Sequence, residues 1–412
     1  MKFSCNGIEG SRTAANGHAA CKPRRREERK AAWPHPNRAK RLECAELAPA
    51  FNDLRRSKAG ASSAHSKRFA TTNAPGILAA CILFALTLYA PRAIANPAAA
   101  TVAQGRASFS SSGPQLTIHT SDRAYINWQS FNIGIGETTT FVQPSSSSLV
   151  WNKINDPNPS QILGNLNANG YVVLQNQSGF YIGGLASITA HGVIMTTAPI
   201  PAPDLAGGGP WDFSAPPPTA SIINYGQIST DKGGSVFLIA HDIQNKGTIS
   251  TPQGSLGLYA GQQVLLSERA DGRGLSAQVT LPAGSVDNEG KLIADAGTIA
   301  VNAQVVNQGG LVQANSVRTV NGAIELLASD AINLGPDSVI EAKGGPQGAS
   351  PGGSILIKSD GLFSDQPTSA INISGGTQGG NGGQAEISAP HMASIQSSIL
   401  GQATRGFRAA SC

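Results

Sequence analysis

The sequence predicts an all-β fold, a parallel β-helix in which short strands coil into a solenoid. Glycine supplies 48 of the 412 residues and charged residues only 13%, which is unusual for a mixed globular fold. Two short patterns recur after residue 220 with a period of about 20 residues. Strands this short cannot each bury an apolar face alone, so equivalent strands must stack and share one continuous core.

The first pattern is N-x-G followed two residues later by Ile or Leu. It begins at Asn224, Asn245, Asn288 and Asn307, with spacings of 21, 43 and 19 residues. We expect these asparagines at the corners of successive coils, because Asn tolerates a left-handed backbone and its amide can hydrogen-bond along a stack. The glycine suits a turn with positive φ.

The second pattern is a glycine followed by alternating positions, as in GSVFLIA from Gly234 and GSLGLYA from Gly254. A period of two residues predicts strands, with Val236, Leu238 and Leu258 on the inward face. An antiparallel sandwich would need tight hairpin turns, and a propeller would need blades of about 40 residues with aromatic signatures. Both alternatives fit the repeats less well. Related segments begin at Gly297, Gly322, Gly353 and Gly383.

The amino-terminal part differs from the rest in charge. Residues 1–76 carry 16 Lys and Arg against 6 Asp and Glu, whereas residues 96–412 carry 13 against 19. The 14 uncharged residues 77–90 are too few for a membrane span of about 20 residues and, with Ala93-Ile94-Ala95, predict a signal peptide cleaved after Ala95. Residues 77–95 are then the signal peptide, with a signal anchor as the alternative. The basic segment before it is an extended signal or a mis-assigned start.

The cysteines favour export without disulfides. Cys5, Cys21, Cys44 and Cys81 precede the expected cleavage site, and Cys412 alone follows it. This distribution excludes a disulfide scaffold and Cys-based zinc sites in the mature chain. The basic run would be removed with the signal, so we expect no nucleic-acid partner.

Two kinds of segment interrupt the repeats. Residues 199–220 are rich in Pro and Gly and predict a loop that leaves a β-helix spanning 96–343, with Trp211 and Phe213 docking it back. Residues 344–412 are expected to add further repeats, with glycine-rich flexible insertions at coil corners, and to end abruptly as if truncated.

Three blocks carry a resemblance to a known family. They are INWQSFNIGIGETTTFVQP at 126–144, PSQILGNLNANGYVVLQNQSGFYI from Pro159 and GGLASITAHGVIMTT from Gly183. Together, residues 105–197 resemble the amino-terminal secretion domain, or haemagglutination activity domain, of filamentous-haemagglutinin-like exoproteins. The family's NPNGI-like motif corresponds to residues 176–180, where Gln177 replaces the proline, and its NPNL motif is not found.

The resemblance implies a right-handed parallel β-helix with an amino-terminal cap. It also implies two-partner secretion, in which an outer-membrane β-barrel transporter with periplasmic POTRA domains exports the chain to the surface of a Gram-negative bacterium. The expected role is that of an adhesin, a haemagglutinin or a toxin carrier, with an unidentified ligand on a host or bacterial surface. Recognition by the transporter is expected within residues 126–180. The expected cap and recognition residues are Asn127, Trp128, Phe131, Asn132, Phe141, Asn176 and Gly179.

Two other function classes remain open. A β-helix enzyme acting on polysaccharides would need stacked carboxylates or calcium ligands on one face, but the aspartates are scattered and His119, His191, His241 and His391 follow no ligand spacing. In GGNGGQAEI, Gln384 stands where a calcium-binding nonapeptide has Asp. We therefore expect no catalytic residue, metal or cofactor. The third class is a nonfunctional fragment of a larger exoprotein.

Overall fold

The computed structural model describes most of the chain after the predicted signal peptide. Its described residues are 95–200, 205, 211–213, 217–268 and 275–403. The predicted basic segment 1–76, the apolar run 77–90 and all five cysteines lie outside these residues. Within the described part, no helix is long and apolar enough to cross a membrane.

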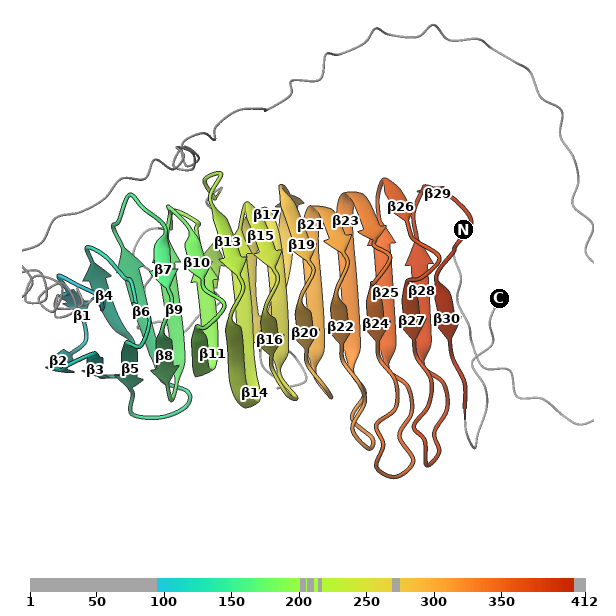
Figure 1. The fold of residues 1–412 in the computed structure, drawn as a ribbon, viewed down its shortest axis with the longest axis horizontal. Helices are drawn as coiled ribbons and strands as arrows, with labels where there is room; N and C mark the ends of the chain where they lie inside the picture. Colours follow the sequence, from blue (N-terminus) through green and yellow to red (C-terminus); the bar gives the residue numbers. More distant parts are fainter. Residues whose placement is uncertain (1–94, 201–204, 206–210, 214–216, 269–274, 404–412) are drawn as a thin grey trace, which may run out of the picture. The chain divides into compact units, whose positions relative to one another are not determined.

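The described residues form 30 strands, most of which wind through three parallel sheets, called here faces 1, 2 and 3 (Figure 1). Face 1 contains β3 (Gln115–Thr120), β5 (Thr138–Val142), β8 (Asn165–Ala168), β16 (Thr248–Ser250), β20 (Lys291–Ile293), β22 (Leu311–Gln313), β24 (Val339–Glu341), β27 (Ala370–Asn372) and β30 (Ser398–Leu400). Face 2 contains β4 (Ala124–Trp128), β6 (Leu149–Ile154), β9 (Tyr171–Asn176), β25 (Ser354–Ser359) and β28 (Gln384–Ser388). Face 3 contains β7 (Ser160–Ile162), β10 (Phe180–Ile182), β13 (Ser221–Asn224), β15 (Asp242–Asn245), β19 (Ser285–Asn288), β26 (Leu362–Ser364) and β29 (His391–Met392).

Longer strands bend around the corners between faces. Two run from face 1 into face 2, namely β11 (Ser187–Thr196) and β14 (Gln227–Ala240). Two run from face 2 into face 3, namely β21 (Thr298–Gln308) and β23 (Ala323–Leu334). A fifth, β17 (Ser255–Glu268), begins in face 2 and then leaves the rod.

The predicted parallel β-helix is confirmed by the register of these ladders. Strands β14 and β17 pair in parallel, with Val236 opposite Leu256 and Leu238 opposite Leu258. All four side chains are at most 1% exposed and belong to the continuous central core. The inward face predicted from the alternating pattern is therefore correct.

The outer side of face 2 is apolar as well, which the alternating pattern does not reveal. Phe237 and Ile239 point away from the central core, yet each is only 1% exposed. They belong to a second cluster that also contains Phe213, and the short strand β12 (Trp211–Phe213) pairs antiparallel with β17. The hairpin of β17 with β18 (Leu275–Pro282) completes this extra sheet. Residues 211–213, which lie within the predicted loop at 199–220, thus cover part of face 2.

The glycine-rich insertions stack on one another in register. The backbone nitrogen of Ser350 donates to the carbonyl of Gly379, and that of Gly352 donates to Asn381, each at 2.9 Å. Figure 1 shows them as long loops before β25 and β28. Gly380 has a φ of 121°, and a Cβ there would lie 2.1 Å from the Ser350 carbonyl oxygen. The insertions therefore extend the ladder outward at one corner.

An antiparallel cap closes the amino-terminal end of the rod. Strand β1 (Thr101–Gln104) pairs antiparallel with β4, and β2 (Ala107–Ser112) forms an antiparallel hairpin with β3. Strand β3 then pairs in parallel with β5 and begins face 1. The hairpin covers a sheet edge that another chain could otherwise extend.

Candidate functional site

An aromatic cluster fills the capped first coil. Trp128, Phe131 and Phe141 are at most 2% exposed. The rings of Trp128 and Phe131 meet edge to face at 5.5 Å, and those of Phe131 and Phe141 stack at 6.4 Å. Phe109, on the cap strand β2, packs edge-on against Trp128 at 5.7 Å. The three predicted aromatics thus form the end of the core beneath the hairpin, and Phe109 was not anticipated.

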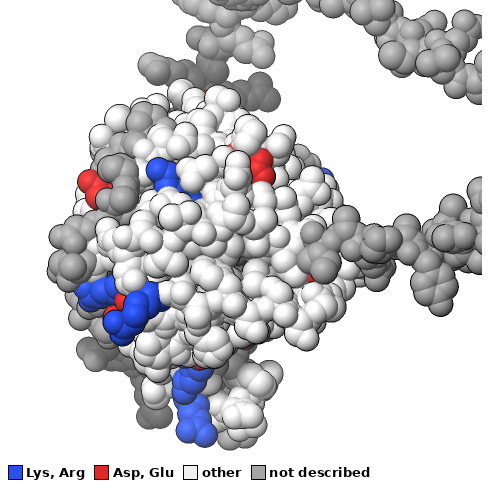
Figure 2. All heavy atoms as spheres, turned by 90° about the vertical axis from the view of Figure 1, so that its left-hand side faces the viewer, with Lys and Arg blue, Asp and Glu red and all other residues white. Residues whose placement is uncertain are grey.

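The surface of the capped end carries few charges. Figure 2 looks onto this end, and most of the atoms it shows belong to residues that are neither acidic nor basic. The few Lys, Arg, Asp and Glu side chains that it shows form small separate groups, one of which holds both signs, rather than a broad patch. A partner at this end would have to use shape, backbone groups and neutral side chains, because electrostatic attraction alone needs clustered charge.

Asparagines tie the first coils together. The Oδ1 atom of Asn132 accepts a hydrogen bond from the backbone nitrogen of Gln161, one coil further on, at 2.8 Å. Asn127 lies half-buried on β4, opposite Thr101 of the cap and Lys153 of the next coil. Trp128 donates its indole N–H to the buried Asn152 at 2.9 Å, a partner that sequence reasoning missed.

Asn176 and Gly179 form a corner that joins neighbouring coils. The fully buried Asn176 accepts from the backbone nitrogen of Ser178 at 2.9 Å and donates to the hydroxyl of Ser160 at 2.9 Å. Gly179 has a φ of 102°, and a Cβ there would lie 2.5 Å from the carbonyl oxygen of Ser221 in the following coil. The corner therefore requires both residue types for local geometric reasons.

A ladder of buried side-chain amides runs along the next corner of the rod. The Nδ2 atom of Asn224 donates to Oδ1 of Asn245 at 2.8 Å, and Nδ2 of Asn245 donates to Oδ1 of Asn288 at 2.7 Å. The three side chains are at most 2% exposed. Each amide therefore satisfies its neighbour in a dry environment, where an unpaired amide would be costly.

The fourth predicted corner residue, Asn307, is displaced from the ladder by one position. Asn288 donates to Oε1 of Gln308 at 2.8 Å, because the strands pair with Asn288 opposite Gln308. Asn307 is half-buried and instead donates to Asp287 and accepts from Asn333. Two glycines, Gly309 and Gly310, follow Gln308. The N-x-G pattern uses Gly309, whereas the strand register aligns Gly310 with Gly290 of the preceding coil.

The comparisons with known proteins bear directly on this capped rod. Residues 93–342, more than half of the chain, match the family described as the TPS secretion domain, where TPS denotes two-partner secretion. The chain belongs to the TPS secretion domain family. The predicted resemblance to filamentous-haemagglutinin-like exoproteins is thereby confirmed.

Named relatives agree with this assignment. The TPS chain is 28% identical over 314 residues to a heme/hemopexin-binding protein of Haemophilus influenzae, covering 72% of this chain and 33% of that protein. The chain therefore spans about a third of the length of this relative. The crystal structure of the HMW1 secretion domain from Haemophilus influenzae superposes with a TM-score of 0.62 at 27% identity, covering 74% of this chain and 84% of that one.

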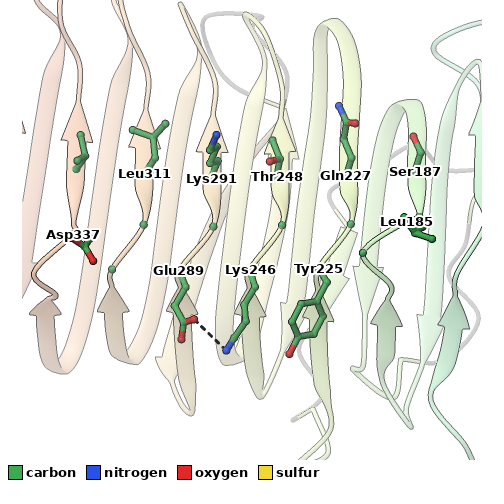
Figure 3. A pocket seen from close by; sticks show the side chains of 18 residues that line it. Leu185, Ser187, Tyr225, Gln227, Lys246, Thr248, Glu289, Lys291, Leu311 and Asp337 are labelled. Carbon is green, nitrogen blue, oxygen red and sulfur yellow. Dashed lines mark ion pairs between the residues drawn. The ribbon is translucent and has the colours of Figure 1, made fainter.

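A shallow groove of about 930 Å³ runs along the flank of the TPS domain (Figure 3). Its floor is a row of glycines, where a Cβ would meet the carbonyl of the preceding coil; for Gly247 the distance to the Gly226 oxygen would be 2.1 Å. Tyr225, Lys246 and Glu289 project to one side of this floor. Ser187, Gln227, Thr248, Lys291 and Leu311 project to the other.

One ion pair spans two coils in this groove. The Nζ atom of Lys246 lies 3.2 Å from Oε2 of Glu289, and this hydrogen bond, together with the charge of Glu289, raises the pKa of Lys246 above its ordinary value. Tyr225 is 42% exposed, and its ring lies 5.8 Å from that of Tyr181. The groove thus offers a mixed polar and aromatic surface.

Titratable residues are dispersed over the TPS domain. Among the described residues, no group of three or more His, Cys, Asp and Glu side chains is placed to hold a metal ion. Nδ1 of His191 lies 2.6 Å from Asp231, and Nδ1 of His241 lies 2.8 Å from Asp242. The first pair links the interiors of the neighbouring strands β11 and β14, and the second links adjacent residues where β14 ends and β15 begins.

Sequence reasoning also missed Glu137. This carboxylate is only 6% exposed and accepts hydrogen bonds from the backbone nitrogens of Gly134 and Ala95, each at 2.7 Å. A single signal could have identified it, since Glu137 is the one charged residue in the block 126–144.

Proposed function

We propose that residues 96–343 direct export of this protein through an outer-membrane transporter with POTRA domains and then nucleate a β-helical rod outside the cell. The observation that carries the proposal is the capped first coil within a chain that matches the TPS secretion domain. The proposed location is therefore the cell surface or the medium of a Gram-negative bacterium.

The cap supports a role in nucleation for a physical reason. In a solenoid, each coil is stabilised mainly by its neighbours, so the first coil needs another partner on its open side. Here the β2–β3 hairpin and the cluster around Trp128 and Phe131 supply that partner. A chain that emerges amino terminus first could fold this end before the later coils arrive.

We place recognition by the transporter in residues 126–180. These residues supply the cap aromatics and the corner at Asn176 and Gly179, and apart from Glu137, Lys153 and Asp156 they are uncharged, with amide, hydroxyl and aromatic groups. Such chemistry suits partners that extend a strand edge through backbone hydrogen bonds. The low charge of the capped end in Figure 2 is consistent with this mode.

A secretion assay tests the proposal. The chain would be expressed with the transporter encoded beside it, and protein outside the cell would be measured for Asn176→Ala combined with Gly179→Ala. We expect secretion to fall strongly. The control is Asn288→Ala combined with Gly290→Ala, a corner outside the block whose glycine is even more crowded, with 2.1 Å from a new Cβ to the Gly247 oxygen. Undiminished secretion of the first variant, or of a chain lacking 126–180, would contradict the proposal.

For the exported rod we propose an adhesin-type role without a catalytic residue. The groove beside Tyr225 is the surface that favours this role, because its exposed aromatic ring and polar walls can contact a ligand on another cell. Purified protein carrying Tyr225→Ala should adhere to cells less than the parent does. Leu362→Ala, exposed on face 3 away from the groove, is the control.

Binding of haem or haemopexin is the alternative ligand class. It is favoured by the 28% identical relative, a heme/hemopexin-binding protein of which this chain covers 33%. Titration of the purified protein with haemin, followed by visible absorbance, would show a saturable spectral change if this alternative holds.

A further inference from the structure

Glu137 is a buried carboxylate that forms no ion pair within the part of the chain that the structure describes. It lies in the corner that precedes β5 and is 6% exposed. Its Oε1 atom accepts from the backbone nitrogen of Ala95 and its Oε2 atom from that of Gly134, each at 2.7 Å. Among the described residues, no Lys, Arg or His forms an ion pair with it. A buried charge held only by neutral donors is costly, so the position invites a cation.

The surroundings of Ala95 are also acidic. A hollow of about 350 Å³ is lined by Ala95 together with Asn132, Gly134 and Asp156, and none of its lining residues is Lys or Arg. Asp156 is the one charged residue among those that line the hollow, and its Oδ1 atom accepts from the backbone and side chain of Asn158. Two carboxylates thus lie near the point where the chain enters the cap.

The residue after Ala95 is fixed in place. The Oδ1 atom of Asn96 accepts from the hydroxyl of Thr139 at 3.2 Å, and its Nδ2 atom donates to the carbonyl of Pro114 at 3.3 Å. Two residues further, Ala98 exchanges backbone hydrogen bonds with the segment 129–130. The start of the predicted mature chain is therefore part of the cap.

We propose that Glu137 binds the α-ammonium group of Asn96 once signal peptidase has cut the chain after Ala95. In that hydrolysis, water splits the peptide bond, Ala95 leaves with the new carboxylate, and Asn96 keeps an amine that takes up a proton. Cleavage removes the Ala95 donor from Glu137 and creates a cation one residue away, where consecutive α-carbons are about 3.8 Å apart. The inference rests on the proposed export, because only an exported chain meets signal peptidase.

The consequence is a cap that is more stable after processing than before. The unprocessed chain offers Glu137 only peptide N–H groups, whereas the processed chain offers an ion pair in a mostly dry corner. The stabilisation is present below the ordinary pKa of an α-amino group, about 7.7–8.0, and is lost as pH rises through the raised pKa of the paired ammonium.

A four-way comparison tests this. Residues 96–412, released from a removable tag so that Asn96 is the first residue, would be compared with the same chain still preceded by residues 93–95. Each would be made with Glu137 and with Glu137→Gln. At pH 7 we expect the free-amine parent to melt higher than the extended parent by roughly 2 °C or more. Glu137→Gln should abolish that difference, and so should raising the pH to 10.

Two controls make the result decisive. Glu289→Gln removes an exposed carboxylate far along the chain and should leave the difference between free and extended chains intact. If Glu137→Gln lowered the melting temperature equally in the free-amine and the extended chain, the proposal would be overturned. A secreted protein that begins at a residue other than Asn96 would also overturn it. Because the tagged chains are made without export, loss of secretion bears on the proposed function and not on this comparison.

Discussion

The indole ring of Trp151 stacks on the phenyl ring of Phe213, with the centroids 6.0 Å apart and the planes inclined by 14°. Trp151 lies on β6 of the rod and Phe213 on β12 of the segment that leaves it. The indole N–H of Trp151 donates to Gln175, whose side chain in turn donates to the carbonyls of Ala198 and Ile200. Hydrogen bonds thus hold Ala198 and Ile200 against face 2, and stacking holds Phe213 there.

Phe213→Ala should lower the free energy of unfolding by about 3–5 kcal/mol, because it opens a cavity between Trp151 and the extra sheet. A urea titration followed by tryptophan fluorescence would measure the loss. Phe109→Ala is the control, since that ring is 42% exposed and should cost much less. Equal losses of unfolding free energy for the two variants would mean that the packing of Phe213 contributes little to the stability of the fold.

Asn245→Ala should destabilise the rod by about 1–3 kcal/mol for each buried partner left unsatisfied, namely the donor of Asn224 and the acceptor of Asn288. Asn307→Ala should cost less, because Asn307 is half-buried outside the amide ladder. The free energy of unfolding of both variants would be compared with that of the parent. A larger loss for Asn307→Ala would contradict the register described here.

Val236→Asp should abolish the folded rod, because it places an unpaired carboxylate in the central core. Gln227→Asp, an exposed position on the same strand, serves as the matched control and should fold. Far-UV circular dichroism should show loss of β-structure for the first variant alone. Leu258→Asp should behave like Val236→Asp, and an unchanged melting curve for both would reverse the assignment of the inward face.

Asp242 makes stability depend on pH in the acid range. Burial raises the pKa of its carboxyl, but hydrogen bonds from His241 and Ser285 outweigh burial and hold that pKa below the ordinary 3.8. Because the pKa is lower in the folded state than in the unfolded state, the carboxylate stabilises the fold at pH values above the unfolded-state pKa. This stabilisation is lost as pH falls through the folded-state pKa. Asp242→Asn should therefore lower the urea midpoint by more at pH 7 than at pH 2.5. An equal shift at both pH values would rule out this origin.

The periodicity alone predicted the coils, their stacking and the inward face, since a strand of five residues leaves few ways to bury Val236 and Leu238. The sequence did not reveal that Phe237 and Ile239 are also buried, because their cover comes from residues 20 or more positions distant. Local alternation describes one strand, and tertiary packing decides which of its sides meets solvent.

The cap aromatics and the corner at Asn176 were anticipated from the three blocks of residues, and their positions agree with a structural role. Glu137 was not anticipated, because its importance depends on burial and on the approach of Ala95 from 42 residues away. The displacement of Asn307 shows a further limit. A repeat with one extra glycine aligns in two ways, and only the hydrogen-bonded register of β19 with β21 distinguishes them.

The amide ladder has a direction. The side-chain NH₂ group of each asparagine donates to the side-chain oxygen of the residue in the coil that follows. Each added coil must therefore supply an acceptor, and its own NH₂ group needs an acceptor in the coil after it. The ladder ends at Gln308, because its Nε2 atom donates to the carbonyl of Gly310 in its own coil at 2.7 Å. The next coil places Leu334 opposite Gln308 and so offers no side-chain acceptor for this amide. The amide ladder is therefore polar: its Asn224 end and its Gln308 end are chemically different.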